Sequence, residues 1–161
     1  MADIIYTIEK HQALFIIIFT AVLAWATISL WLTTRKLWFQ TERASQGAII
    51  LQANRDLFFH ERMYKVRKAI ESKKPIFESK GGQCSDQDVE DYIGYFDTLY
   101  EFMESNILNV KMTNDNFGYY VEEAYKNEEI KNYITALRRE LDDEELYSGF
   151  ENWAKNNLPK F

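Results

Sequence analysis

A long uncharged stretch near the N-terminus dominates the hydrophobic pattern of this chain. From Ala13 to Thr34 no side chain carries a charge, and Arg35 and Lys36 follow at once. At 1.5 Å per residue, a helix over this stretch would reach about 33 Å, which is enough to cross a hydrocarbon core of about 30 Å. The pattern therefore predicts one transmembrane helix over residues 13–34.

A cleaved secretory signal is the alternative explanation of the same stretch. Lys10 precedes the apolar run, and Ala24-Trp25-Ala26 has the small-x-small pattern of a cleavage site. However, Asp3 and Glu9 accompany the lysine, so the leader is not basic, and the apolar run continues well past the cleavage pattern. These two features favour a retained membrane helix.

The flanking charges predict which side of the membrane holds the C-terminal part. One lysine precedes the run, whereas Arg35, Lys36 and Arg43 follow it. Lysine and arginine are retained on the cytoplasmic side of a membrane. We therefore expect residues 1–12 to lie outside the cytoplasm and residues 35–161 to form a cytosolic domain.

Beyond the run, apolar positions recur at steps of three and four residues, which is typical of helices. Proline is absent between Leu37 and Glu71, so the membrane helix is expected to continue into a long cytosolic helix that ends before Lys74-Pro75. Ser85 and Asp88 have the spacing of a capping box with aspartate in place of glutamate. Further helices are expected from Ser85 to about Ser105, with a core stripe of Val89, Tyr92, Phe96, Leu99 and Met103, from Thr113 to about Lys126, from Asn127 to Leu141, and from Asp143 to about Asn156.

No segment alternates as a strand does. The predicted fold class is therefore all-α: one transmembrane helix that continues into a bundle of four or five helices.

The charge of the chain is acidic and unevenly distributed. The 19 basic and 25 acidic side chains give a formal net charge of -6, which disfavours an extended nucleic-acid surface. Residues 62–80 are rich in lysine and arginine, whereas residues 86–104 carry acidic side chains and no basic one. The simpler explanation is attraction between neighbouring helices of one subunit, and contact between subunits is the alternative.

Few residues suggest catalytic or metal chemistry. The chain has two histidines, one cysteine (Cys84) and no glycine-rich phosphate loop. A single cysteine cannot form an internal disulfide. We expect neither a metal site nor a cofactor, and most classes of enzyme are unsupported.

One constellation remains, in Asn54-Arg55-Asp56-Leu57-Phe58-Phe59-His60, which contains Arg-x4-His with a polar residue after the arginine. This resembles the motif of HEPN domains, helical bundles of which many are ribonucleases. The resemblance implies that His60 would act on the 2'-hydroxyl or the leaving oxygen while Arg55 stabilises phosphate charge. Two copies of the motif usually face each other across a dimer.

The geometry of a regular helix argues against catalysis by this pair within one chain. Five residues of helix would leave Arg55 and His60 pointing about 140° apart, unless the helix starts or bends between them. Asn54 could provide such a start. Otherwise Arg55 pairs with a carboxylate and His60 packs with one nitrogen satisfied, or the motif has a structural or regulatory role.

The layout of the whole chain resembles a more specific family. An N-terminal span, a helical domain, and Arg55 with His60 are similar to the small membrane accessory proteins of type VI-B RNA-targeting CRISPR systems. The resemblance implies a homo-oligomeric ring of about eight subunits in the bacterial inner membrane. Its pore would compromise the membrane when the RNA-guided nuclease, its functional partner, is active in antiviral defence. In nuclease HEPN domains the motif generally lies late in the bundle, whereas here it lies early, which favours a structural role.

Small and hydroxyl side chains recur along one face of the predicted span, at alternating four- and three-residue steps. They include Thr20, Ala24, Thr27, Trp31 and Thr34. Such a face can pack closely against another helix or line a narrow pore. Alternatively, each hydroxyl only bonds its own backbone. A pore here would be weakly selective, because no ionisable side chain lies in the span.

Three functions follow from these patterns. We favour a homo-oligomeric membrane effector. The alternatives are a membrane-tethered ribonuclease that uses Arg55 and His60, and a non-catalytic tether that recruits a cytosolic partner through residues 62–80 or 86–104.

Overall fold

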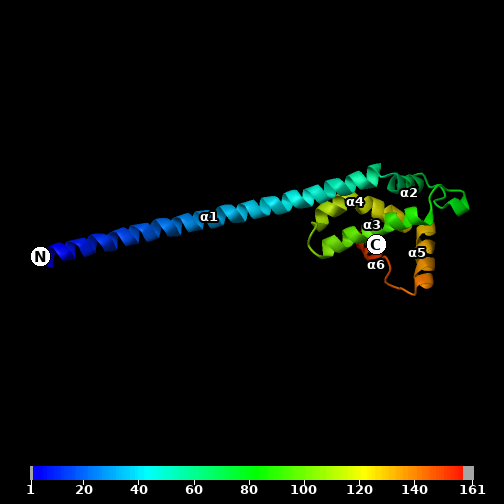
Figure 1. Ribbon diagram of the computed structural model, residues 1–161. Coiled ribbons are helices and arrows are strands. Elements are labelled where there is room, and N and C mark those ends of the chain that lie inside the picture. The colour runs from blue at the N-terminus through cyan, green and yellow to red at the C-terminus, as the bar shows by residue number, and fades with distance from the viewer. Residues whose placement is uncertain (1, 158–161) are drawn as a thin grey trace. The chain divides into compact units, whose positions relative to one another are not determined.

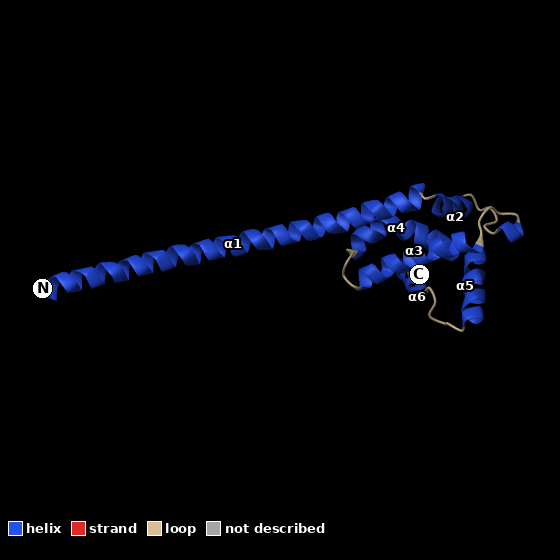
Figure 2. Ribbon diagram, viewed as in Figure 1, coloured by secondary structure: helices blue, strands red, loops and turns tan. Residues whose placement is uncertain are grey.

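The structure is a computed structural model that describes residues 2–157, with side chains described at His11, Gln12, Leu14 and residues 16–157. The regular elements in this range are helices joined by loops, which confirms the predicted all-α fold (Figures 1 and 2). The chain divides into two compact units, Met1–Ser45 and Gln46–Phe161.

Helix α1 (Ala2–Phe59) supplies the first unit and the beginning of the second. Many of its large apolar side chains between Leu14 and Phe39 are exposed; the exposed fraction of Trp25 is 73%. The most apolar 18-residue window of α1 has a mean hydropathy of 2.1, and 0% of this window is buried. The described part of the chain therefore contains one helix that is long and apolar enough to cross a membrane. A signal sequence near the N-terminus would meet the same criterion. Most side chains of the predicted outer segment, residues 1–12, lie outside the described residues.

The second unit begins within α1 and continues into α2 (Glu61–Glu71). The prediction of one unbroken helix to Glu71 is wrong, because His60 has an extended backbone with φ -73° and ψ 124°. The break lets two helix segments bury different apolar faces: Leu57 is fully buried before it and Val66 after it.

The connection from α2 to α3 is a compact loop with one short 3-10 turn, η1 (Glu78–Lys80). Two backbone hydrogen bonds of 3.0 Å close it, from Glu78 N to Cys84 O and from Cys84 N to Ile76 O. Gly82 lies against the carbonyl oxygen of Ile76, so closely that a Cβ at this position would collide with it. The loop therefore requires glycine there.

Helix α3 (Asp86–Glu104) begins as predicted. The Ser85 side chain accepts a hydrogen bond from Asp88 N at 3.2 Å, and the Asp88 carboxylate accepts one from Ser85 N at 2.9 Å. The predicted core stripe of α3 is also confirmed, since its members are all buried: Val89, Tyr92, Phe96, Leu99 and Met103.

Helix α4 (Val110–Lys126) begins earlier than predicted. Its cap is Asn109, whose side chain accepts a hydrogen bond from Met112 N at 3.0 Å. The prediction that Thr113 caps this helix is wrong: Thr113 is buried in the first turn and donates its hydroxyl to Asn109 O. Both residues are good caps, and only packing distinguishes them.

Helix α5 (Glu128–Leu141) is capped by Asn127, as predicted, through a hydrogen bond from Glu129 N. Helix α6 (Ser148–Asn157) begins later than the predicted Asp143. Asp142 and Tyr147 have positive φ angles of 52° and 59°, so the intervening residues form turns instead of helix.

The core of the second unit is aromatic and lies between α3, α4 and α6 (Figure 1). The ring of Phe96 on α3 packs at 6.0 Å from Trp153 and 6.4 Å from Phe150, both on α6. Phe117 on α4 is fully buried in the same cluster. Five helices follow α1 within the described residues, at the upper end of the predicted number.

Candidate functional site

The Arg-x4-His segment occupies the last turns of α1 and the break that follows. Asn54 donates a 3.1 Å hydrogen bond to the side chain of Asn116 on α4. Asp56 accepts one of 2.9 Å from the amide of Gln52, one turn earlier. The side chains of Arg55 and His60 are exposed. The helix neither starts at Asn54 nor bends between the two residues, because α1 is regular through Phe59.

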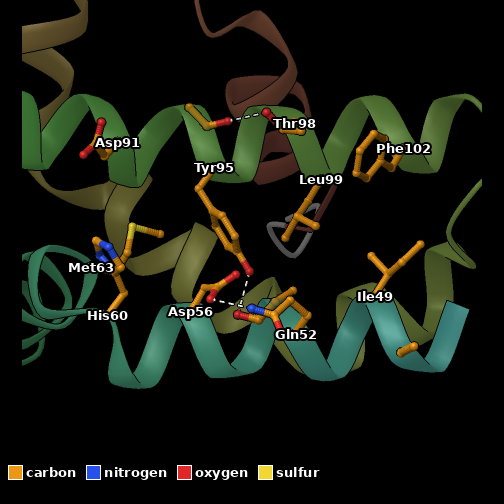
Figure 3. A pocket seen from close by; sticks show the side chains of 13 residues that line it. Ile49, Gln52, Asp56, His60, Met63, Asp91, Tyr95, Thr98, Leu99 and Phe102 are labelled. Carbon is orange, nitrogen blue, oxygen red and sulfur yellow. Dashed lines mark hydrogen bonds between the residues drawn. The ribbon is translucent and has the colours of Figure 1, made fainter. Parts of the chain in front are cut away.

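Arg55 and His60 line different hollows of the surface. His60 and Asp56 line a groove of about 750 Å³ that lies between the end of α1 and α3 (Figure 3). Arg55 and Asn54 line a second hollow of about 560 Å³, which adjoins the groove because Ala48 and Gln52 line both. Within one copy, the two motif residues therefore do not converge on a common point where a phosphate could bind.

The α1–α3 groove has an apolar half and a polar half (Figure 3). Ile49 on α1 faces Leu99 and Phe102 on α3 in the apolar half, and His60 and Asp91 lie in the polar half. A groove of this volume, with an apolar wall and a few polar groups at one end, has the anatomy of a binding site.

Tyr95 lies in the middle of the groove and connects its two walls. Its phenol on α3 donates a 2.7 Å hydrogen bond to the backbone carbonyl oxygen of Ala53 on α1 (Figure 3). Burial raises the pKa of this phenol, and the nearby Asp56 carboxylate raises it further. The phenol therefore remains protonated and keeps its role as donor at neutral pH.

The two carboxylates of the groove differ in their partners. The carboxylate of Asp91 forms a salt bridge of 2.9 Å with the guanidinium of Arg62 on α2. The same guanidinium lies 3.6 Å from the carboxylate of Asp88. Burial alone would raise the pKa of Asp91, but hydrogen bonds from Gln87 and Arg62 and the charge of Arg62 lower it overall. Asp56 is not a member of any ion pair among the described residues.

The Arg62 pair confirms that attraction between residues 62–80 and 86–104 operates within one subunit. Other basic side chains of α2 pair inside their own helix. Lys65 lies 2.8 Å from Glu61, and Arg67 lies 2.6 Å from Glu71.

Arg67 belongs to residues 62–80, the basic segment expected to recruit a partner, but its guanidinium packs against aromatic rings of its own subunit. Its side chain is nearly buried, and its guanidinium lies 4.6 Å from the ring of Phe58, 5.3 Å from Tyr64 and 5.9 Å from Tyr120. The sequence contains an indication of this burial, because position 67 falls on the apolar face of α2 and its partner Glu71 lies four residues later. A buried arginine cannot recruit a partner, so the tether hypothesis loses part of its predicted surface.

A stripe of α1 on the side of Arg55 is exposed and largely apolar. Leu51 and Phe59 are 72% and 82% exposed, and Arg55 lies between them at four-residue spacing. The guanidinium of Arg55 makes no hydrogen bond or ion pair with another described residue. We call Leu51, Arg55 and Phe59 the α1 stripe.

The small-residue face of the apolar run was the other predicted site. Its members are all exposed in this structure: Thr20, Ala24, Thr27, Trp31 and Thr34. Thr20 and Thr27 each donate a 2.8 Å hydrogen bond to the carbonyl oxygen four residues earlier. Both hydroxyls are thus satisfied within their own helix.

No group of three or more histidine, cysteine or acidic side chains among the described residues is placed to hold a metal ion. Cys84 is buried, and burial raises the pKa of its thiol.

Comparison with curated proteins and with solved structures gave no match. A family model does match, over residues 14–156. The matched range begins within the apolar run of α1 and extends through α2, α3, α4 and α5 to Asn156 in α6. That family is described as a domain of unknown function, DUF4760. Because the match covers most of the sequence, this chain belongs to the DUF4760 family.

Proposed function

We propose that this protein is a single-pass membrane protein that acts as a homo-oligomeric effector, with its helical domain in the cytoplasm. The main support for the proposal is the exposure of the apolar part of α1. In its most apolar 18-residue window, 0% of the residues are buried. Transfer of apolar surface out of water is favourable by about 25 cal/mol per Å². A helix with this much exposed apolar surface is therefore more stable in lipid than in water.

The charges after the apolar run support the orientation. Arg35, Lys36 and Arg43 are the basic residues nearest its C-terminal end. The guanidinium of Arg35 lies 5.5 Å from the ring of Trp31 and 5.8 Å from that of Phe39. Aromatic and basic side chains together are typical of the cytoplasmic interface of a membrane.

The resemblance to type VI-B CRISPR accessory proteins supports the biological setting. In this proposal the protein forms a ring in the bacterial inner membrane, and the ring compromises that membrane when the RNA-guided nuclease is active. Exposed Leu51 and Phe59 support assembly, because apolar side chains of this size gathered on one face commonly mark interaction surfaces. The small-residue face around Ala24 would allow spans to pack closely.

The motif geometry favours a structural role over ribonuclease activity. A nuclease would need Arg55 and His60 at one phosphate, and in one copy they line separate hollows. If purified protein cleaves RNA, and Arg55→Ala and His60→Ala each abolish the cleavage, the ribonuclease alternative replaces the structural role.

Dye release from vesicles tests the membrane function. Full-length protein is reconstituted in vesicles that contain phosphatidylglycerol, with or without the type VI-B nuclease and its target RNA. We expect leakage that depends on the active nuclease, and a ring-sized oligomer in detergent. A monomer, or an oligomer that never causes leakage, would contradict the proposal.

Two matched variants sharpen this test. Ala24→Leu enlarges a side chain on the small-residue face, whereas Ala26→Leu makes the identical change about 200° of helix rotation away from Ala24. We expect leakage to fall several-fold for Ala24→Leu and to stay unchanged for Ala26→Leu, because only the first obstructs close packing or the pore. Equal effects would show that the face has no special role.

A further inference from the structure

We infer that the α1–α3 groove of one copy receives the α1 stripe of a second copy, so that Arg55 of one subunit pairs with Asp56 of its neighbour. This inference rests on the proposed homo-oligomer and names the surface that forms it. It also assigns the occupant of the groove, which is a second copy of this chain.

The α1 stripe has the properties of the inserting side. Leu51 and Phe59 expose most of their apolar surface, and burial of each side chain would stabilise a complex. Arg55 lies between them and has no hydrogen-bond or ion-pair partner among residues 2–157, the described part of the chain. Arginine is one of the residue types enriched at interface hot spots.

The groove has the complementary properties. Its apolar half, formed by Ile49, Leu99 and Phe102, can accept an apolar side chain. Its polar half holds Asp56, a carboxylate that has no cationic partner among the described residues. Asp91 in the same half is already paired with Arg62, so Asp56 is the carboxylate left for an incoming guanidinium.

The order and spacing of the two surfaces agree. Along α1, the apolar Ile49 precedes Asp56 by seven residues, which is about 10 Å of helix. In the stripe, Leu51 precedes Arg55 by four residues, about 6 Å, and the arginine side chain can span the difference. Copies inserted by the same span share one direction in the bilayer, so Leu51 meets the apolar half and Arg55 meets Asp56. Phe59, one turn beyond Arg55, would then contact the end of the groove that Met63 lines.

The two surfaces lie on different sides of α1, which decides the type of assembly. Arg55 and Asp56 are adjacent in sequence but line separate hollows. Each copy can therefore offer its stripe to one neighbour and its groove to another. Such a head-to-tail interface closes into a ring when the rotation permits.

This interface also gives the Arg-x4-His segment a role that one copy cannot supply. The pairing would bring Arg55 of one subunit into the groove that His60 of the next subunit lines. The two residues would then be neighbours across the interface, with Arg55 anchoring the contact. Anionic lipid is a poorer occupant, because the polar half of the groove carries Asp56 and Asp91.

A reciprocal charge exchange tests the pairing. In Arg55→Glu protein the stripe opposes Asp56 with a like charge, and in Asp56→Lys protein the groove opposes Arg55 with a like charge. We expect each variant alone to weaken assembly in detergent by at least about tenfold. In an equimolar mixture the copies can alternate, every contact again joins opposite charges, and assembly should return.

The control for folding and net charge is Arg139→Glu, because Arg139 on α5 is also exposed and lines neither surface. It should assemble as the wild type does. Circular dichroism of each variant must show wild-type helicity.

A second measurement does not depend on charge: Leu51→Cys and Phe102→Cys proteins carrying different tags are mixed and treated with a mild oxidant. A disulfide between differently tagged copies is expected.

The outcomes separate the inference from the proposed function. If both charge variants form oligomers as the wild type does, the proposed interface is wrong and the proposed membrane function is unaffected. Variants that fail alone and are not restored by mixing overturn the Arg55–Asp56 pairing, as does the absence of a cross-linked pair. Monomeric wild-type protein overturns both.

Discussion

The phenol of Tyr95 donates a 2.7 Å hydrogen bond to the carbonyl oxygen of Ala53, and this bond joins α3 to the last turns of α1 across the groove. A second bond, from Asn54 to Asn116, joins α1 to α4. Together they hold the part of α1 that carries Arg55 and Asp56 against the helical domain. The shape of the proposed interface therefore depends on two polar contacts as well as on the burial of Leu57.

Tyr95→Phe should lower the free energy of unfolding by about 1 kcal/mol at neutral pH, because it removes one partly buried hydrogen bond and keeps the ring. Urea unfolding of the full-length protein in detergent measures the change. Tyr119→Phe is the control, with an expected effect below about 0.5 kcal/mol, since Tyr119 is 60% exposed.

The same variant has a predicted pH dependence. The folded-state pKa of Tyr95 is raised, so its stabilising contribution is complete below the unfolded pKa and is lost as pH rises towards the folded one. The stability difference between wild type and Tyr95→Phe should therefore shrink above about pH 10. A difference that grows with pH would contradict the assigned burial.

Gly82→Ala should destabilise the domain by roughly 2 kcal/mol, because the added Cβ collides with backbone at Ile76 that cannot move without opening the loop. Gly47→Ala is the matched control. Its Cβ would meet nothing within 4 Å, and Gly47 lies inside α1, so this change should stabilise the helix by about 0.5–1 kcal/mol. Thermal unfolding should shift in opposite directions for the two variants.

Arg67→Ala should cost roughly 2–3 kcal/mol, since it leaves Glu71 without its partner and opens a hole between Phe58 and Tyr120. Lys68→Ala, at the exposed neighbouring position, should change stability by less than about 0.5 kcal/mol. Similar losses for the two alanine variants in urea unfolding would show that Arg67 is not held as described.

Arg62→Ala should cause a small loss of stability at neutral pH that disappears in acid. The pKa of Asp91 is depressed in the folded state, so its contribution is present above the unfolded value, 3.8, and is lost as pH falls through the folded one. The urea midpoints of wild type and variant should converge as pH falls below 3.8. Lys111→Ala, at an exposed position of α4, should show no such convergence.

The helix starts show how far local sequence predicts this fold. The capping box of Ser85 and Asp88 and the cap at Asn127 were predictable because all their hydrogen bonds lie within three residues. The start of α4 was not predictable in this way, because Asn109 and Thr113 are both good caps. Only the burial of Thr113 in the folded domain shows that it is not the cap. The break at His60 has no strong local signal, since neither proline nor glycine lies near it.

The sequence by itself determined that the chain is all-helical and that it contains an uncharged run from Ala13 to Thr34, because periodicity and charge are local properties. Only the tertiary structure decided that Arg55 and Asp56 face separate hollows, and that Arg67 is buried while Lys68 is exposed. A helix turns by about 100° per residue, so neighbours in sequence always diverge. Which of them is buried, paired or left for a partner depends on the helices packed around them.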